Sequence, residues 1–300
     1  MMRLERPPHD MATTLAACLK GITGNNALRG GVQANNAWLV ALEAQYSTIV
    51  AAEGLATIPA LLKAGDPIIV GTLRKSHFKK LYDYYLRSKL NVDGRAIYNA
   101  IMSAAGGKCP YCGGLGATRN LDHHLPIAYF PQFSILPLNL VPACRDCNMD
   151  GKPDGYAAVQ SEQIIHPYVD HARFFDEQWI SGTFVPAQGS KPSHVEYCVS
   201  PPDNWPEVNK ARAQRHFEEF GVADKYATQA SEMVGVTLAQ IEALREAGLD
   251  DALIVRTILD PGERKAPFVN HWSRGMYQAL RASMPLISRR VTVVPVNGRS

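Results

Sequence analysis

The chain has 300 residues, of which 46% are hydrophobic, so it can bury the core of one large domain or of two modest ones. Its 31 Lys and Arg residues against 28 Asp and Glu residues give a formal net charge of +3. This balance excludes a polybasic protein that coats nucleic acid over its whole surface, and any phosphate-binding surface must be local.

Residues 1–93 are predicted to be mainly helical. The stretch 10–64 is rich in Ala and Leu and predicts two or more helices, separated by a loop at 21–31. At 76–89, apolar and aromatic residues recur at helical spacing and predict a helix with one buried face. Its basic residues scatter over the other sides, which favours a solvated face over a stripe that binds nucleic acid.

Two CxxC pairs follow a further helix predicted at 94–105. They are Cys109 with Cys112 and Cys144 with Cys147. Each pair can present two thiolates from one tight turn, and together they complete a closed tetrahedral Cys₄ site for a structural zinc ion. The alternative is four free thiols. The spacing argues against disulfides and favours a reducing cytoplasm.

The other two cysteines, Cys18 and Cys198, stand alone, and each is expected to be a buried, inert thiol. No apolar run reaches the ~18 residues of a membrane-spanning helix. The start, MMRLERPPHD, lacks the apolar core of a signal peptide. We therefore expect a soluble, unexported protein with no membrane partner.

Polar residues between and beside the cysteine pairs carry the candidate chemistry. Asp122 offers a hard oxygen ligand, Asn148 offers a neutral oxygen, and His123 is a base that titrates near neutrality. Phosphodiester hydrolysis needs an activated water and a cation that neutralises charge on the phosphate. The alternative is that Asp122 and His123 are an ordinary pair at the end of a strand.

The order of these positions resembles the HNH endonuclease family. The family pattern has Asp-His, two variable residues and Pro, then a middle Asn, then a closing His or Asn beside the second Cys pair. The stretch 122–126 reads Asp-His-His-Leu-Pro, the middle residue is Asn139, and the closing residue is Asn148, which makes this an H-N-N variant. The resemblance covers roughly residues 98–155.

The resemblance implies a ββα-metal core with a role for each residue. Asp122 and Asn148 would hold one Mg²⁺ or Mn²⁺ ion, and His123 would take the proton from the attacking water. Asn139 would orient that base through hydrogen bonds to the backbone of the loop between the strands; a plain turn-forming Asn is the alternative.

Three residues near the motif, His124, Arg145 and Lys152, have alternative roles. Alignment on Pro126 gives the role of base to His123, and successive strand residues face opposite sides, so His124 cannot point at the same metal. His124 would support the site, face DNA or be a covered surface residue. Arg145 and Lys152 bracket the expected start of the helix, where they would contact the substrate phosphate or only solvent.

Beyond the motif, strands are predicted at 179–185 and 194–199, followed by a helical last third. Within that third, Thr237 is expected to cap a new helix, and the Asp-Pro-Gly sequence at 260–262 is expected to break one. A strand or a loose tail is expected at 291–296. His166 and His171 are expected to pack or to form hydrogen bonds rather than to make a second site.

These features predict an α+β protein: a mainly helical chain with an inserted ββα-metal (HNH) core bracketed by a Cys₄ zinc site. The expected regions are a helical 1–93, a nuclease core with its extension at 94–200, and a helical 201–300. The expected function is that of a cytoplasmic, metal-dependent DNA endonuclease, similar to standalone prokaryotic nucleases that defend against foreign DNA. The alternatives are a nuclease subunit activated by an ATPase or sensor partner, and a catalytically silent, zinc-ribbon-like DNA-binding module.

Overall fold

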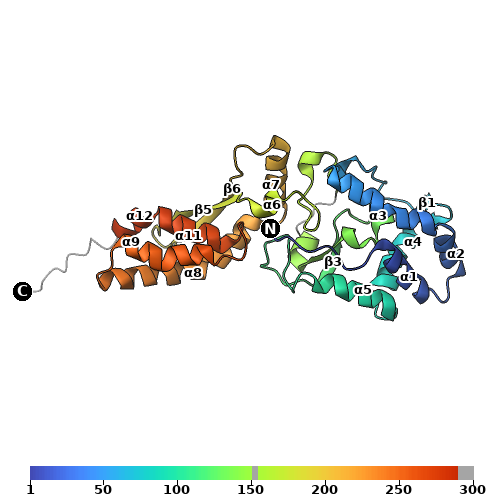
Figure 1. The fold of residues 1–300 in the computed structure, drawn as a ribbon, viewed down its shortest axis with the longest axis horizontal. Helices are drawn as coiled ribbons and strands as arrows, with labels where there is room; N and C mark the ends of the chain where they lie inside the picture. The colour runs from blue at the N-terminus through green and yellow to red at the C-terminus, as the bar shows by residue number, and fades with distance from the viewer. Residues whose placement is uncertain (151–154, 290–300) are drawn as a thin grey trace, which may run out of the picture. The chain divides into compact units, whose positions relative to one another are not determined.

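The computed structural model describes residues 1–150 and 155–289 of a mixed α+β chain (Figure 1). The chain packs as two compact units, the first made of residues 1–171 and 206–220 and the second of residues 172–205 and the chain from 221 onward. The first unit thus joins residues that the sequence-based division assigns to three separate regions, 1–93, 94–200 and 201–300.

The first unit contains eight α and π helices, four strands and several short 3₁₀ turns among the described residues. The helices are α1 (Met11–Gly21), α2 (Asn26–Ala34), α3 (Asn36–Ala51), α4 (Lys75–Lys80), η2 (Leu81–Leu86), α5 (Val92–Ser103), η5 (Asp146–Asp150) and α7 (Glu207–Glu219). The strands are β1 (Ile68–Val70), β2 (Leu73–Arg74), β3 (Asn120–His123) and β4 (Leu140–Ala143), and the 3₁₀ turns are η1 (Leu55–Thr57), η3 (Pro131–Phe133), η4 (Pro137–Asn139) and η6 (Gln160–Glu162).

The N-terminal helices begin at side chains that cap them. The Asp10 carboxylate accepts a hydrogen bond from the backbone N–H of Thr13 at 2.7 Å, and the Asn25 side chain accepts one from Leu28 at 3.0 Å. The loop predicted at 21–31 is therefore too long, because the cap at Asn25 starts α2 within it. The helix predicted at 76–89 is present as α4 continued by the wider π turn η2.

The hairpin of β3 and β4 lies in the core of the first unit. The two strands are antiparallel, with Asp122 opposite Val141 and His123 opposite Leu140. Two tyrosines from the preceding helices bind the backbone of Leu121: the Tyr82 hydroxyl donates to its carbonyl oxygen at 2.8 Å, and the Tyr98 hydroxyl accepts from its N–H at 3.2 Å. The helical region thereby fixes the strand that carries the candidate site.

The second unit pairs one β hairpin with helices. Its strands are β5 (Ile180–Val185) and β6 (His194–Val199), as predicted, and its helices are α6 (Arg173–Asp176), α8 (Val222–Glu246), α9 (Asp251–Ile254), η7 (Val255–Leu259), α10 (Asp260–Arg264), α11 (Trp272–Ala282) and α12 (Met284–Arg289). Asn270 joins these elements, because its side-chain oxygen accepts from the N–H groups of Trp179 and Ile180 while its carbonyl accepts from the Tyr226 hydroxyl.

Two predicted helix boundaries in this unit are wrong. Thr237 does not begin a helix, because Val234, Thr237 and Ile241 continue one buried stripe along the unbroken α8. Pro261 does not break the chain, because it lies in the first turn of α10, where a helix does not need its N–H. The prediction at 291–296 lies outside the described residues.

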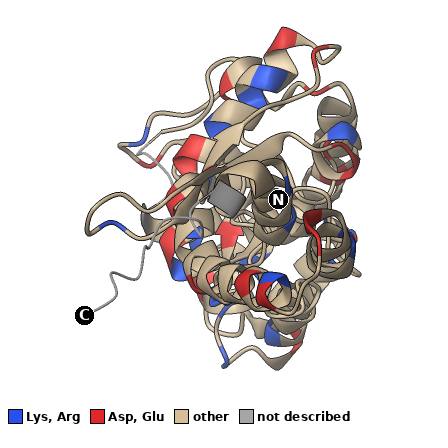
Figure 2. Cartoon of the chain, turned by 90° about the vertical axis from the view of Figure 1, so that its left-hand side faces the viewer, with Lys and Arg blue, Asp and Glu red and all other residues tan. Residues whose placement is uncertain are grey.

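Charge is mixed along the chain. Figure 2 shows Lys and Arg interspersed with Asp and Glu over the described segments rather than collected on one of them, which agrees with the small net charge. None of the described helices is both long and apolar enough to cross a membrane.

Candidate functional site

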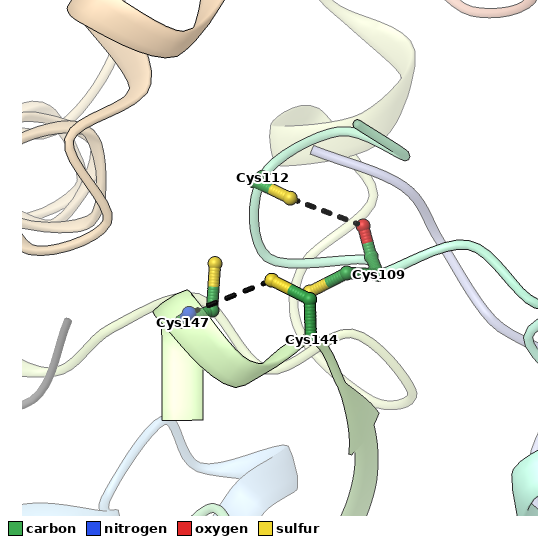
Figure 3. A group of neighbouring side chains, drawn as sticks. All are labelled: Cys109, Cys112, Cys144 and Cys147. Atoms are coloured by element: carbon green, nitrogen blue, oxygen red, sulfur yellow. Dashed lines mark hydrogen bonds between the residues drawn. The ribbon is translucent and has the colours of Figure 1, made fainter. Parts of the chain in front are cut away.

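Four cysteines converge at one end of the β3–β4 hairpin (Figure 3). Cys109 and Cys112 come from the loop after α5, and Cys144 and Cys147 come from the end of β4 and the helical turn that follows. All four side chains are buried, and their sulfur atoms lie within 4.8 Å of one another. Zinc–thiolate bonds of about 2.3 Å in a tetrahedron need such a spacing, so the cluster can hold a metal ion such as zinc.

The electrostatics divide the four thiols into two groups, because hydrogen bonding to neighbouring thiols raises the pKa of Cys109 and of Cys147. Hydrogen bonds between neighbouring thiols, of which the one with Cys109 has the largest effect, lower the pKa of Cys144 to about 7 and lower the pKa of Cys112 by more. The backbone N–H of Gly116 also donates to the Cys112 sulfur at 3.3 Å. Thiolates are the form that binds zinc, and a cation is what allows several of them to share one buried site.

Gly116 is a part of this site that sequence reasoning missed. A Cβ atom at this position would lie 2.5 Å from both the Cβ and the Sγ of Cys144. The Gly116 carbonyl also accepts from the N–H of Cys109 at 2.8 Å, so its backbone binds both cysteines of the first pair while it lies against Cys144 of the second. A glycine that follows a CxxC pair by a few residues was the available signal.

Asp122 and His123 are buried neighbours on β3, exposing 7% and 9% of their surface. The Nε2 atom of His123 lies 2.9 Å from the backbone carbonyl oxygen of Ser134, and its ring packs edge-on against Tyr82 at 4.4 Å between centroids. Because a carbonyl oxygen only accepts, Nε2 carries the proton in the neutral ring and Nδ1 carries the lone pair. Burial raises the pKa of Tyr82, and the Asp122 carboxylate adds to this effect.

Asn139 closes the loop at the other end of the hairpin. Its side-chain oxygen accepts from the backbone N–H of Leu125 at 2.7 Å, and its Nδ2 donates to the carbonyl oxygens of Leu125 and Phe133, each at 3.2 Å. Asn139 itself is fully buried. These hydrogen bonds fix the loop that presents the Ser134 carbonyl to His123.

His124 points to a different set of neighbours from His123, as alternation along a strand requires. Its ring lies 4.0 Å from that of His166, and its Nδ1 lies 3.5 Å from the Tyr111 hydroxyl. The Tyr46 hydroxyl joins this group to the loop, lying 3.2 Å from His166 Nε2 and 3.3 Å from Asn139 Oδ1. His166 is buried and hydrogen-bonded, as predicted.

The support that Tyr46 gives to Asn139 is a second feature that sequence reasoning missed. Tyr46 comes from α3 and lies 93 positions before Asn139, so no local spacing links them. A polar hydroxyl on an otherwise apolar helix face was the only signal in the sequence.

The predicted closing and phosphate-binding residues lie on or near η5. The N–H of Asn148 donates to the Cys144 carbonyl at 3.1 Å, which places Asn148 one turn after the cysteine, and its side chain is partly exposed. Arg145, at the start of this turn, is exposed. Lys152 lies outside the described residues.

The two cysteines outside the cluster, Cys18 and Cys198, differ in their exposure to solvent. Cys18 is buried in α1, and burial raises the pKa of its thiol to about 12, so it is inert as predicted. The same prediction is wrong for Cys198, which is exposed because it occupies an outward-facing position of β6, beside the Ser181 hydroxyl at 3.2 Å.

Together, these features define an α+β protein with a buried four-cysteine cluster able to hold a metal ion. No protein-family model and no solved structure matches the chain. Protein ea31 of Escherichia phage lambda is 37% identical to it over 226 residues, which is 72% of this chain and 75% of that protein. The chain therefore belongs to the same family as protein ea31.

Proposed function

We propose that this protein is a metal-dependent DNA endonuclease of the HNH type. The observation that carries the proposal is the way His123 is held: its Nε2 donates to the Ser134 carbonyl, in the loop that the Asn139 side chain pins to the backbone. A histidine that is fixed in one tautomer on a paired strand is suited to general base catalysis.

In this proposal His123 takes a proton at Nδ1 from the water that attacks the phosphodiester. The Ser134 carbonyl then stabilises the imidazolium, because it already accepts from Nε2–H. The hydrogen bonds of Asn139 keep this carbonyl in place, so Asn139 is a positioning residue. The exposed guanidinium of Arg145 is free of the core and suits contact with a backbone phosphate.

Asp122 and Asn148 are the proposed ligands of the catalytic ion. A carboxylate and an amide oxygen form a hard donor set that leaves several positions for water and phosphate, as Mg²⁺ or Mn²⁺ prefers. When bound, such an ion would neutralise charge on the phosphate and on the leaving oxygen. The four-cysteine cluster is proposed to hold a separate, structural zinc ion.

The burial of the proposed catalytic pair favours a second candidate, a nuclease that a partner activates. Asp122 and His123 expose only 7% and 9% of their surface, whereas a phosphodiester must reach both. Binding of DNA, or of an ATPase or sensor subunit, would then have to open the site. The partner and a role against foreign DNA are implied by the resemblance, and a cytoplasmic location is predicted from the spacing of the cysteine pairs.

The test is cleavage of supercoiled, linear and single-stranded DNA by purified protein with Mg²⁺, Mn²⁺ or EDTA. We expect wild type to cut with either ion and not with EDTA, and His123→Ala to lose at least about a hundredfold in rate, the usual contribution of a general base. His171→Ala is the matched control, because that histidine is exposed. Equal cleavage by wild type and His123→Ala would exclude His123 as the base.

If the wild-type protein cuts no DNA in the absence of other proteins, the independently active nuclease is excluded, and further experiments test the partner-activated one. If it gains activity when the partner is co-purified from its native host, the partner-activated form is supported. If Asp122→Ala also leaves divalent-ion binding unchanged, the catalytic ion is not held by Asp122, and the silent zinc-binding module is the remaining function.

A further inference from the structure

A pocket of about 250 Å³ opens beside the candidate site, within the first unit. Three consecutive residues of its wall, His124, Leu125 and Pro126, directly follow His123 in the chain. The other walls come from η1, from the segment around Tyr156 and Gln163, and from α7. None of the pocket's lining residues has a role in the proposed hydrolysis.

Two buried N–H groups in the wall of this pocket have no acceptor. Gln163 is 5% exposed, and its Nε2 atom forms no hydrogen bond with any described residue; the same holds for the buried Nε of Arg215. The backbone of Gln163 is nevertheless well held, since its carbonyl accepts from Arg212 at 3.2 Å. A buried donor without a partner costs about 1–3 kcal/mol, so a ligand that supplies acceptors is favoured here.

Charge around the pocket argues against an anionic ligand. Among the described residues that line the pocket, the carboxylates of Glu162 and Glu219 outnumber the single cation, Arg215, and Glu219 already binds its guanidinium at 2.6 Å. A phosphate group would therefore meet net negative charge. A neutral ligand that presents hydrogen-bond acceptors avoids this repulsion.

The volume and the remaining walls favour a small, partly apolar ligand. Leu55, Leu125 and Ile164 are apolar, and Tyr156 offers an aromatic ring that is 44% exposed and rests on Tyr129 at 4.9 Å between centroids. The pocket is smaller than the roughly 300–1,000 Å³ typical of sites for drug-sized ligands. A single ring system with acceptors on its edge satisfies these conditions.

We propose that this pocket receives one unstacked nucleobase, with Gln163 and Arg215 donating to its edge and Tyr156 stacking on its face. That the base belongs to the DNA strand being cut rests on the proposed nuclease function. A base held one residue beyond His123 would fix the register of the strand at the site. Extraction of a base costs a few kcal/mol and is cheapest in single-stranded or distorted DNA, which the pocket would therefore select.

The first test measures nucleobase binding without any need for catalysis. Saturation-transfer NMR on the full-length protein detects weak binding of each of the four deoxynucleosides, and ³¹P line broadening detects binding of inorganic phosphate. We expect at least one deoxynucleoside to bind wild type, and Gln163→Leu to bind it about tenfold more weakly, the cost of one lost hydrogen bond. Gln214→Leu is the matched control, an exposed glutamine on the same α7 that lines the pocket.

Stability separates a binding role from a structural one. Gln163→Leu removes an unpaired buried donor and is expected to raise the melting temperature while it weakens binding. Should the variant fail to fold, Tyr156→Ala provides the same binding test at a partly exposed position, with a loss of about tenfold expected from lost stacking. A fall in melting temperature without any change in binding would assign Gln163 to the fold.

The outcomes also distinguish this inference from the proposed nuclease. DNA cleavage without deoxynucleoside binding, or binding that neither variant weakens, overturns the base pocket and leaves the nuclease intact. Binding of phosphate that depends on Arg215, without binding of any deoxynucleoside, also overturns the base pocket. The pocket would then be an anion site. If wild type cuts no DNA but binds a deoxynucleoside, and Gln163→Leu loses that binding, the base pocket is supported and a nuclease that acts alone is excluded.

Discussion

The two ends of the β3–β4 hairpin are held by different chemistry. At the end where Asn120 pairs with Ala143, four thiols from two short turns converge on one point. At the end where His123 pairs with Leu140, the loop is held by the buried hydrogen bonds of Asn139 and Tyr46. The first end can be joined through one ion that all four thiols share, whereas the support of the second end is divided among several neutral hydrogen bonds. We therefore expect a single substitution to damage the first end more.

The largest effect is expected from Cys144→Ser. Loss of one thiolate from a buried four-thiolate site removes most of the folding free energy that metal binding supplies, which is about 10–16 kcal/mol for structural zinc in small domains. We expect insoluble protein or a loss of bound zinc, measured by elemental analysis and by the yield of folded protein. Cys198→Ser, at an exposed thiol, serves as the control and should retain the metal. Full zinc content in Cys144→Ser would show that Cys144 is not a ligand.

Gly116→Ala tests the four-cysteine end of the hairpin without replacing a proposed metal ligand. The added methyl group would clash with Cys144 at 2.5 Å, and such overpacking costs about 1–3 kcal/mol. We expect a lower melting temperature and faster loss of zinc to a chelator. Gly30→Ala, where a Cβ meets nothing within 4 Å, should not lower stability. Equal chelation rates in the two variants would mean that the loop tolerates the clash.

Acidification should weaken a contact between α7 and the first cysteine loop. Burial lowers the pKa of His216 to about 3, and this histidine contacts the Tyr111 carbonyl at 2.9 Å and accepts from the Ile165 N–H at 3.3 Å. Because the folded pKa lies below the ordinary value, the neutral ring stabilises the fold fully above pH 6.5 and progressively less as the pH falls toward 3. By pH 5 the loss is about 2 kcal/mol.

The measurement for His216 is the free energy of unfolding between pH 7.5 and pH 5. His216→Gln should lower stability at pH 7.5 and flatten the dependence on pH. His194→Gln, at a partly exposed histidine, should leave the wild-type slope unchanged. A slope that survives in His216→Gln would assign the acid sensitivity to another group.

The smallest effect is expected from Tyr46→Phe, at the hydrogen-bonded end. It removes a hydroxyl between Asn139 and His166, but Asn139 keeps its bonds to Leu125 and Phe133, so the cost to stability is about 1 kcal/mol. If the nuclease proposal is correct, cleavage should slow moderately while zinc content stays complete. Tyr84→Phe, at an exposed tyrosine, is the control. Loss of zinc in Tyr46→Phe would contradict the independence of the two ends.

Much of the local structure could be predicted from the sequence because its signals are short in range. The CxxC spacing brought Cys109, Cys112, Cys144 and Cys147 together as expected, and the strands predicted at 179–185 and 194–199 are present as β5 and β6. The errors arose where packing overrides local preference. Thr237 has the chemistry of a cap, yet its place in a buried stripe keeps it inside α8.

The sequence by itself determined the four-thiol site, the α+β class and the order of the polar residues in the motif, since each depends on residue type and on spacing along the chain. Only the tertiary structure decided that Tyr46 meets Asn139, that His124 meets His166, and that α7 completes a pocket beside β3. These contacts join residues far apart in the sequence, and which ones form depends on how whole elements pack. A buried donor such as that of Gln163 becomes visible only when its neighbours are in place.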